Sequence, residues 1–177
     1  RRQMLTIADI LEALGGIRPT RGNQVIIDAV IDSREVSQGS MFIALPGENH
    51  DGHDFVGDAF HSGASIALIN KAPHQDFMAL DLRSALPSPE IDIPDFPFCI
   101  LVEDSLQALQ NIARYWRQKL TPRVIGITGS VGKSTTKELV AEVIDQRFRT
   151  LKNPGNLNNE IGLPLTILRL DRGHQVA

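Results

Sequence analysis

The sequence predicts an α/β protein with a largely parallel sheet, followed by the start of a second parallel-sheet unit. Two observations carry this prediction. Short apolar runs typical of strands alternate with segments whose apolar residues recur at helical spacing. A glycine-rich turn at 129–134 stands between a predicted strand and a predicted helix. Parallel strands need long crossover connections, usually helices, so the alternation favours a parallel sheet over hairpins.

Bulk properties narrow the class of protein. The chain has 177 residues, enough for one domain and part of another. Its net charge of −3 argues against nucleic-acid binding, which usually needs a basic surface. No apolar stretch approaches the roughly 18 residues of a membrane span, and Asp9 and Glu12 interrupt the N-terminal segment too early for a signal peptide. The single cysteine, Cys99 in "FCILV", predicts a buried thiol in a cytoplasmic protein.

The first half of the chain predicts a helix and then a set of strands. Thr6 is placed to cap the helix, whose apolar residues are helically spaced, and Gly15-Gly16 ends it. A short helix at 54–63 is closed by Gly63. The predicted strands are 24–31, 41–45, 65–70 and 98–102.

Residues 71–97 predict an irregular surface loop because five prolines interrupt them. The next helix begins at Asp104 or Ser105. Its apolar face is formed by Leu106, Leu109, Ile112, Ala113, Trp116 and Leu120.

A domain boundary is predicted at "LTPR", where Pro122 breaks that helix. The expected domains are 1–120 and 121–177. The second contains a strand at 123–128, a helix at about 133–147, a strand at 149–151 and a helix starting near Glu160, and no element is expected to close it. It has about 57 residues, fewer than the roughly 100–150 of a typical domain, so we expect it to be truncated.

The turn between strand and helix predicts a phosphate-binding loop. Glycines let successive backbone N–H groups face one anion, and the helix N-terminus adds partial positive charge. Lys133 supplies a full charge for the β- and γ-phosphates, and the Ser134 hydroxyl is a suitable Mg²⁺ ligand. The predicted ATP-binding residues are Gly129, Ser130, Val131, Gly132, Lys133, Ser134 and Thr135.

Two alternatives compete with this interpretation. One is a glycine-rich strand–helix turn without a ligand, because Ile127 stands where the usual motif has its first glycine. We assign Ile127 to the strand and expect a tighter loop. The other is the loop of partition-type ATPases, which carries an extra lysine where this chain has Thr128.

Polar residues in the first half form a second candidate site. Ser33 and the forked cation of Arg34 follow a predicted strand and suit a diphosphate or a uridine edge. The alternative for Arg34 is a surface ion pair with Asp32 or Glu35. Asp51 and His53 flank a glycine in "ENHDGHDF". Two interpretations of this segment stay open: its residues bind a ligand, or they only form a turn with a helix cap at Asp54. A metal site is disfavoured. Phe55 and Phe60 are expected in the core.

The segment "NPGNLNNEIG" concentrates asparagines at 153–159. Asparagine offers both a donor and an acceptor and tolerates left-handed backbone. Asn156, Asn158 and Asn159 are the candidate ligand contacts. The alternative is a turn and a cap for the helix near Glu160.

Three motifs together resemble the Mur ligase family. They are "TGSVGKSTTKE" (128–138), "NPGNLNNEIGLPLTILRL" (153–170) and "DSREVSQGSMFIALPGENHDGHDF" (32–55), which departs from the family pattern at Gln38. Among Mur ligases, the "GNLNN" run is similar to members that join D-alanyl-D-alanine to UDP-N-acetylmuramoyl-tripeptide. Sister ligases that add the third amino acid share the N-terminal pattern but lack that run.

The resemblance implies an ATP- and Mg²⁺-dependent enzyme that forms an amide bond through an acyl phosphate, with Lys133 as its catalytic residue. The domain 1–120 would bind the UDP substrate, with help from asparagines of the second domain. The implied substrate contacts are Ser33, Arg34, Asp51, His53, Asn156, Asn158 and Asn159. The family's magnesium-binding glutamate, carbamylated lysine and dipeptide domain would lie beyond residue 177. We therefore expect this segment to be inactive alone, and we expect a monomer.

Three other functions remain open from the sequence. They are a sister ligase that adds the third amino acid, a P-loop ATPase or GTPase switch, and a non-catalytic UDP-sugar-binding module.

Overall fold

The computed structural model describes residues 4–47, 50–72, 77–84, 88–155 and 157–177, which form two compact units. The first unit contains Leu5–Ile112, and the second is built mainly from Ala113–Ala177. The division falls inside helix α3 (Ser105–Lys119). The domain boundary at 120/121 stays a prediction.

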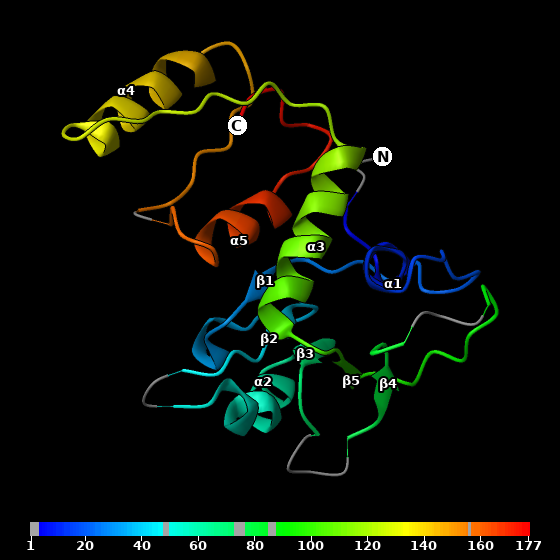
Figure 1. The fold of residues 1–177 in the computed structure, drawn as a ribbon. Coiled ribbons are helices and arrows are strands. Elements are labelled where there is room, and N and C mark those ends of the chain that lie inside the picture. The colour runs from blue at the N-terminus through cyan, green and yellow to red at the C-terminus, as the bar shows by residue number, and fades with distance from the viewer. Residues whose placement is uncertain (1–3, 48–49, 73–76, 85–87, 156) are drawn as a thin grey trace. The chain divides into compact units, whose positions relative to one another are not determined.

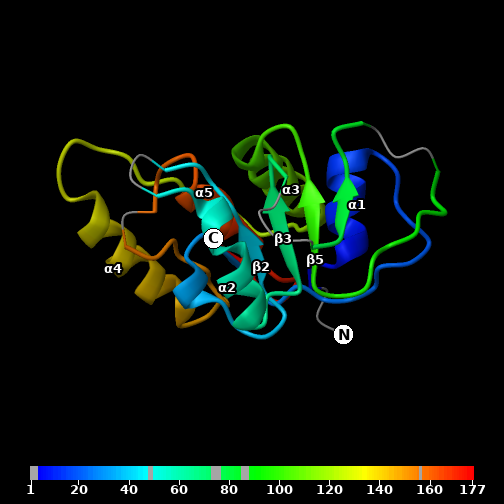
Figure 2. The same ribbon diagram turned by 90° about the horizontal axis from the view of Figure 1, so that it is seen from below.

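A five-stranded parallel sheet organises the first unit (Figures 1 and 2). Its strands lie in the order β1-β2-β3-β5-β4, and every pairing is parallel. The bounds are β1 Ala29–Val30, β2 Met41–Ile43, β3 Ile66–Ile69, β4 Ala79–Asp81 and β5 Phe98–Leu101. The predicted α/β class with a parallel sheet is therefore confirmed.

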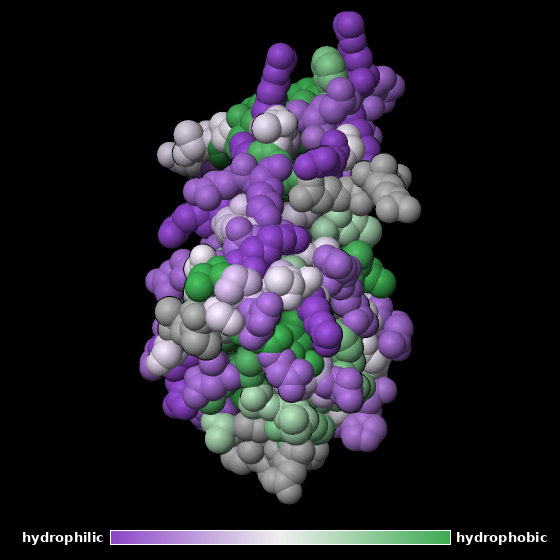
Figure 3. Space-filling view, turned by 90° about the vertical axis from the view of Figure 1, so that its right-hand side faces the viewer, coloured by the Kyte–Doolittle hydropathy of each residue, from purple (hydrophilic) through white to green (hydrophobic). Residues whose placement is uncertain are grey.

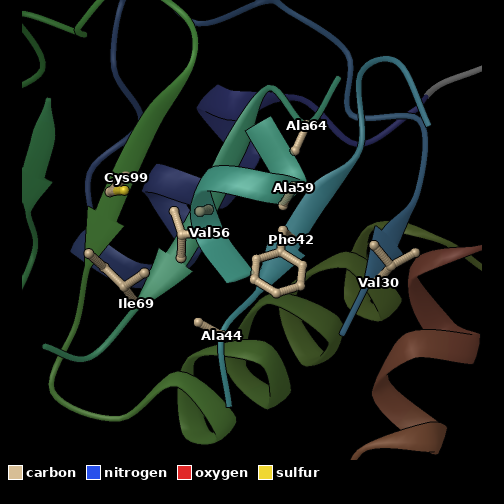
Figure 4. Packing of buried hydrophobic residues seen from close by; sticks show 9 residues of the cluster. Val30, Phe42, Ala44, Val56, Ala59, Ala64, Ile69 and Cys99 are labelled. Atoms are coloured by element: carbon tan, nitrogen blue, oxygen red, sulfur yellow. The ribbon is translucent and has the colours of Figure 1, made fainter. Parts of the chain in front are cut away.

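Both faces of the sheet are covered, because helices lie on opposite sides of it. Helix α2 (Val56–His61) lies on one side, and α1 (Ile7–Gly15) and the first half of α3 lie on the other (Figures 1 and 2). Val56 and Ala59 of α2 point at Phe42 and Ile69 of the sheet (Figure 4). Successive strand residues point to opposite faces, so the alternate residues face α1 and α3. These are Met41, Ile43, Ile66, Leu68, Phe98 and Ile100, all fully buried.

The ends of two helices follow the predicted local chemistry. The Thr6 hydroxyl accepts from the backbone N–H of Asp9, whose carboxylate accepts from the N–H of Thr6 in return. Gly16 ends α1 in the left-handed region at φ +77°. At the start of α3, the Asp104 carboxylate accepts from the N–H of Gln107, so Asp104 is the cap.

Cys99 is confirmed as a buried thiol on β5. Burial raises the pKa of Cys99 to about 12, so the sulfur stays protonated at neutral pH.

Three predictions about the first unit are wrong. The strand expected at 24–31 is reduced to Ala29–Val30, because β2 offers pairing partners only there. The segment 71–97, expected to be irregular, contains β4, which pairs with β5 at the sheet edge. Phe55, expected in the core, is 36% exposed. The predicted helix at 54–63 comprises a 3-10 turn (Gly52–Phe55) followed by α2.

The second unit contains α4 (Lys133–Asp145), α5 (Gly162–Leu168) and three paired backbone segments. Val176 forms parallel bridges with Arg123 and with Thr150, so 175–177 lies between the other two segments. The strands predicted at 123–128 and 149–151 are thus present only as single bridges. The pairing residues at 175–177 were not predicted, and α5 begins two residues after Glu160.

Trp116 connects α3 to the segment after α5 in the second unit. Its indole N–H donates to the carbonyl oxygen of Leu170 at 2.8 Å, and the ring is fully buried. A buried indole needs such a partner, so this contact joins α3 to the turn after α5.

The surface in Figure 3 is mostly hydrophilic, with apolar residues in small groups. Across the part of the chain that the structure describes, every helix is too short or too polar to cross a membrane.

Candidate functional site

The loop 129–132 leads directly into α4, as the motif predicts. Gly132 is the N-cap of this helix at φ +80°, and its carbonyl accepts from the N–H of Thr136 at 2.9 Å. Gly129 has a φ of +152°, where a side chain is strained. The loop is open, since Val131 at its tip is 93% exposed. Both glycines are therefore required by the backbone path.

Lys133 is the first residue of α4 and folds back over the loop. Its ammonium donates to the carbonyl oxygen of Gly129. Lys133 and Ser134 line a cavity of about 530 Å³ within the second unit, a volume typical of small-molecule sites. The charge, the hydroxyl and the helix N-terminus thus lie at one place, which is the arrangement that binds phosphate.

Part of the asparagine-rich segment lines the same cavity. Asn153, Gly155 and Asn158 line it. The Asn159 side-chain oxygen accepts from the N–H of Gly162 at 2.7 Å, which is the capping alternative. Asn156 lies outside the described residues. The structure therefore brings Asn158 to the phosphate loop and uses Asn159 at the start of α5.

Two side chains of α4 contact this segment or the residue directly before it. The ammonium of Lys137 donates to the carbonyl oxygens of Asn153 and Gly155, at 2.8 and 2.9 Å. Glu138 forms an ion pair with Lys152, and this ammonium, with that of Lys137, lowers the pKa of Glu138. Sequence reasoning missed Lys137, although it lies four residues after Lys133 and so on the same helix face.

Ser33 and Arg34 form a short 3-10 turn (Ser33–Glu35) after β1, at the carboxyl edge of the sheet. The guanidinium of Arg34 forms a two-pronged ion pair with Asp32, with N–O distances of 2.9 and 2.6 Å. This pairing lowers the pKa of Asp32 to about 2. The ion-pair alternative is thus present in the structure, and Arg34 remains 87% exposed.

Asp51 and His53 lie in a tight loop after β2. Gly52 packs so closely that an added Cβ would lie 2.7 Å from the backbone nitrogen of Leu45, so no other residue fits there. Asp51 accepts from the backbone N–H of His53 and forms an ion pair with Lys71. These contacts, with the Lys71 ammonium first, hold the pKa of Asp51 below its usual range.

The His53 ring is buried and has a partner at each nitrogen. Nδ1 lies 2.6 Å from Oδ1 of Asp51, and Nε2 accepts from the backbone N–H of Asn70 at 3.2 Å. His53 therefore joins the loop after β2 to the end of β3. Sequence reasoning missed Asn70 and Lys71, although both directly follow a predicted strand, where parallel sheets place ligand-binding loops.

The two groups of candidate residues lie in different units. Ser33, Arg34, Asp51 and His53 belong to the first unit, and the phosphate loop and the asparagines belong to the second. Within the described residues, no group of three or more His, Cys, Asp or Glu side chains is placed to hold a metal ion.

Two family models match the chain over these same regions. The model of the Mur ligase family catalytic domain matches residues 29–117, and the model of the Mur ligase middle domain matches residues 127–177.

Individual relatives agree with the family models. The UDP-N-acetylmuramoyl-tripeptide–D-alanyl-D-alanine ligase of Bacillus subtilis (strain 168) is 37% identical over 97% of this chain and 34% of its own length. The structure of MurF from Acinetobacter baumannii superposes on the whole chain at a TM-score of 0.70 and 28% identity, over 35% of its own length. MurF ligase from Thermotoga maritima, in complex with ADP, gives a TM-score of 0.64 and 32% identity, over 85% of this chain and 31% of its own.

The chain thus spans about a third of the length of the relatives that it matches. The family models cover the predicted residues of both candidate sites and leave out residues 118–126, which include the first four residues of the predicted strand before the phosphate loop. The chain belongs to the Mur ligase family.

Proposed function

We propose that the full-length protein is an ATP-dependent ligase that joins D-alanyl-D-alanine to UDP-N-acetylmuramoyl-tripeptide in peptidoglycan synthesis. The observation that carries the proposal is the cavity shared by the phosphate loop and the asparagine-rich segment, with Lys133 and Asn158 both lining it. The named activity of the Bacillus subtilis relative, similar over nearly the whole chain, supports the choice of substrates.

ATP would bind at the phosphate loop. The Thermotoga maritima MurF ligase was solved with ADP, which supports a nucleotide for this chain too. Lys133 would leave the Gly129 carbonyl to meet the β- and γ-phosphates, and the N–H groups at the start of α4 would donate to the same oxygens.

A magnesium ion fits the donor set beside Lys133. Ser134 offers one hydroxyl at the cavity wall, and Mg²⁺ commonly takes few protein ligands and completes its shell with water and phosphate oxygens. When bound, the ion would neutralise charge on the transferred phosphoryl group. Lys133 and Ser134 would hold the phosphates of ATP in one orientation in the cavity.

The first unit would hold the UDP part of the substrate at the carboxyl edge of its sheet. Ser33, Arg34, Asp51 and His53 all follow strands there, which is where open parallel sheets bind ligands. The Arg34 guanidinium is exposed and matches a diphosphate geometrically, although this would require Arg34 to exchange Asp32 for the ligand.

The proposed chemistry has two steps. The tripeptide carboxylate takes the γ-phosphoryl group of ATP, giving an acyl phosphate and ADP. The amine of D-alanyl-D-alanine then attacks the acyl carbon, phosphate leaves, and the amine loses one proton. Positioning and charge neutralisation dominate such phosphoryl transfer. We further propose a cytoplasmic monomer, a location supported by the single buried thiol.

The test is a ligation assay with the full-length protein, ATP, UDP-N-acetylmuramoyl-tripeptide and D-alanyl-D-alanine. We expect one ADP per amide bond formed, and we expect Lys133→Ala to lower the rate at least about 100-fold because it removes a transition-state charge. Arg21→Ala, at an exposed cation in the first unit, serves as the control. Product formed only with a free amino acid and the UDP-dipeptide would identify a sister ligase instead.

A further inference from the structure

We infer that Lys137 is a positioning residue, which holds residues 153–155 against the phosphate-loop helix so that the two walls of the ATP cavity keep their spacing. The inference rests on the proposed function, because it concerns the same cavity. It assigns a role to a lysine that contacts neither the loop 129–132 nor a candidate ligand atom.

The contacts of Lys137 occupy all the donors of its ammonium group. Two donors meet the carbonyl oxygens of Asn153 and Gly155, at 2.8 and 2.9 Å, and the third direction faces Oε1 of Glu138 at 3.3 Å. A lysine ammonium has three donors and no acceptor. Lys137 is therefore committed to the protein, whereas Lys133 contacts only its own loop among the bonds described.

Burial makes this contact costly to break. The Lys137 side chain is 15% exposed, while Lys152 and Glu138, which join the same helix to the same segment, are each 43% exposed. A cation that loses its partners in a mostly buried position leaves its charge and two carbonyl groups unsatisfied. The exposed pair contributes far less because water screens it.

The place of the contact links it to catalysis. Lys133 and Lys137 are four residues apart on α4, so they project from the same face of the helix into the cavity wall. The carbonyl oxygens of Asn153 and Gly155, which also line the cavity, accept from Lys137. Loss of the Lys137 contact would allow the two walls to move relative to each other, and reacting groups tolerate little displacement.

The experiment compares three variants of the full-length enzyme. Lys137→Met keeps most of the side-chain volume but removes the donors, Lys137→Arg keeps a charged donor, and Lys152→Met removes the exposed ion pair of the same two elements. Steady-state kcat and KM for ATP and for the UDP-tripeptide are measured, together with amide hydrogen exchange in residues 150–155.

We expect Lys137→Met to lower kcat by about 10- to 100-fold, with less than about a threefold change in KM for ATP. Lys137→Arg should recover at least part of that loss, and Lys152→Met should stay within about twofold of wild type. Hydrogen exchange in 150–155 should accelerate only in Lys137→Met. If Lys137 has a purely structural role, Lys137→Met should lower the melting temperature without changing kcat per folded molecule. Lys137→Met and Lys137→Arg should then have the same kcat.

The inference is overturned if Lys137→Met has the kcat of wild type, or if Lys152→Met loses as much. Should Lys137→Met not fold, Lys137→Gln replaces it under the same criteria. If wild type forms no ligation product, the proposed function fails, and hydrogen exchange in the variants still decides whether Lys137 holds the segment.

Discussion

Nδ1 of His53 lies 2.6 Å from Oδ1 of Asp51, in a ring whose other nitrogen accepts the backbone N–H of Asn70. Because Nε2 accepts a hydrogen bond, the ring proton is on Nδ1, and the Nδ1–H group donates a hydrogen bond to the Asp51 carboxylate. The imidazole is thereby a fixed link between two loops at the carboxyl edge of the sheet, where the UDP part of the substrate is proposed to bind.

Replacing His53 should destabilise the protein. His53→Leu keeps an apolar side chain in the buried position but leaves the N–H of Asn70 and the Asp51 carboxylate without this partner. We expect a loss of about 2–3 kcal/mol in the free energy of unfolding. Urea denaturation followed by circular dichroism measures it. His61→Ala, at an exposed histidine of α2, is the control, with an expected change below about 0.5 kcal/mol. Equal losses in both would contradict a special role for His53.

The Asp51 carboxylate should make the stability of the folded protein depend on pH at acidic pH values. Its pKa in the folded protein is below the ordinary value of 3.8, mainly because of the Lys71 ammonium. The unfolded state therefore binds the proton more readily, so this stabilisation is fully present above pH 3.8 and is lost as the pH falls through the folded pKa. The melting temperature of wild type, relative to Asp51→Asn, should thus stay constant from about pH 6 to about pH 4.5 and fall as the pH is lowered further toward about pH 2. A constant difference would rule this out.

Gly132 allows a direct test of the phosphate loop, because Gly16 has nearly the same backbone. Their φ values are +80° and +77°, and an added Cβ meets nothing within 4 Å at either position. Alanine at each position should therefore cost a similar strain of about 1 kcal/mol. Only Gly132→Ala should also weaken ADP binding, by about tenfold or more, because it redirects the N–H groups of the loop. Titration calorimetry with ADP measures this. Unchanged affinity in Gly132→Ala would place the nucleotide elsewhere.

Trp116 is the only tryptophan of the chain, so its fluorescence reports on the packing of α3 at the Leu170 contact. Its full burial predicts blue-shifted emission that acrylamide quenches poorly. Trp116→Phe removes the donor to the Leu170 carbonyl and should cost about 2 kcal/mol. Circular dichroism during urea unfolding measures the loss. Arg114→Gln, at an exposed position of the same helix, should have almost no effect, and a comparable loss there would show that the indole contact adds little.

Features encoded by a few adjacent residues were predictable from the sequence. Thr6 and Gly16 bound α1 as expected, and the glycine-lysine string predicted the loop before α4, because caps and turns depend on local backbone chemistry. The buried runs around Phe42 and Leu68 likewise identified central strands.

Features that depend on a distant partner were not predictable. β4 is a short, largely exposed strand, Ala79–Asp81, inside a segment interrupted by prolines, and it becomes a strand only because β5 pairs with it. The segment 24–31 was predicted to be too long a strand. Its apolar run is typical of a strand over its whole length, but only Ala29 and Val30 pair with β2. The spacing from Lys133 places Lys137 on the same helix face, but its contact could not be predicted, because its two carbonyl partners lie 16 and 18 residues away.

The position of Val176 between Arg123 and Thr150 bears on the order in which the protein is made. Among the residues that the structure describes in this unit, the two outer segments form their bridges with Val176, so they stay unpaired until the ribosome has added residues 175–177. The five strands of the first unit, by contrast, are complete once Leu101 has emerged. Domains fold in the order of synthesis, so we expect the first sheet to form while the second unit is still an unpaired nascent chain.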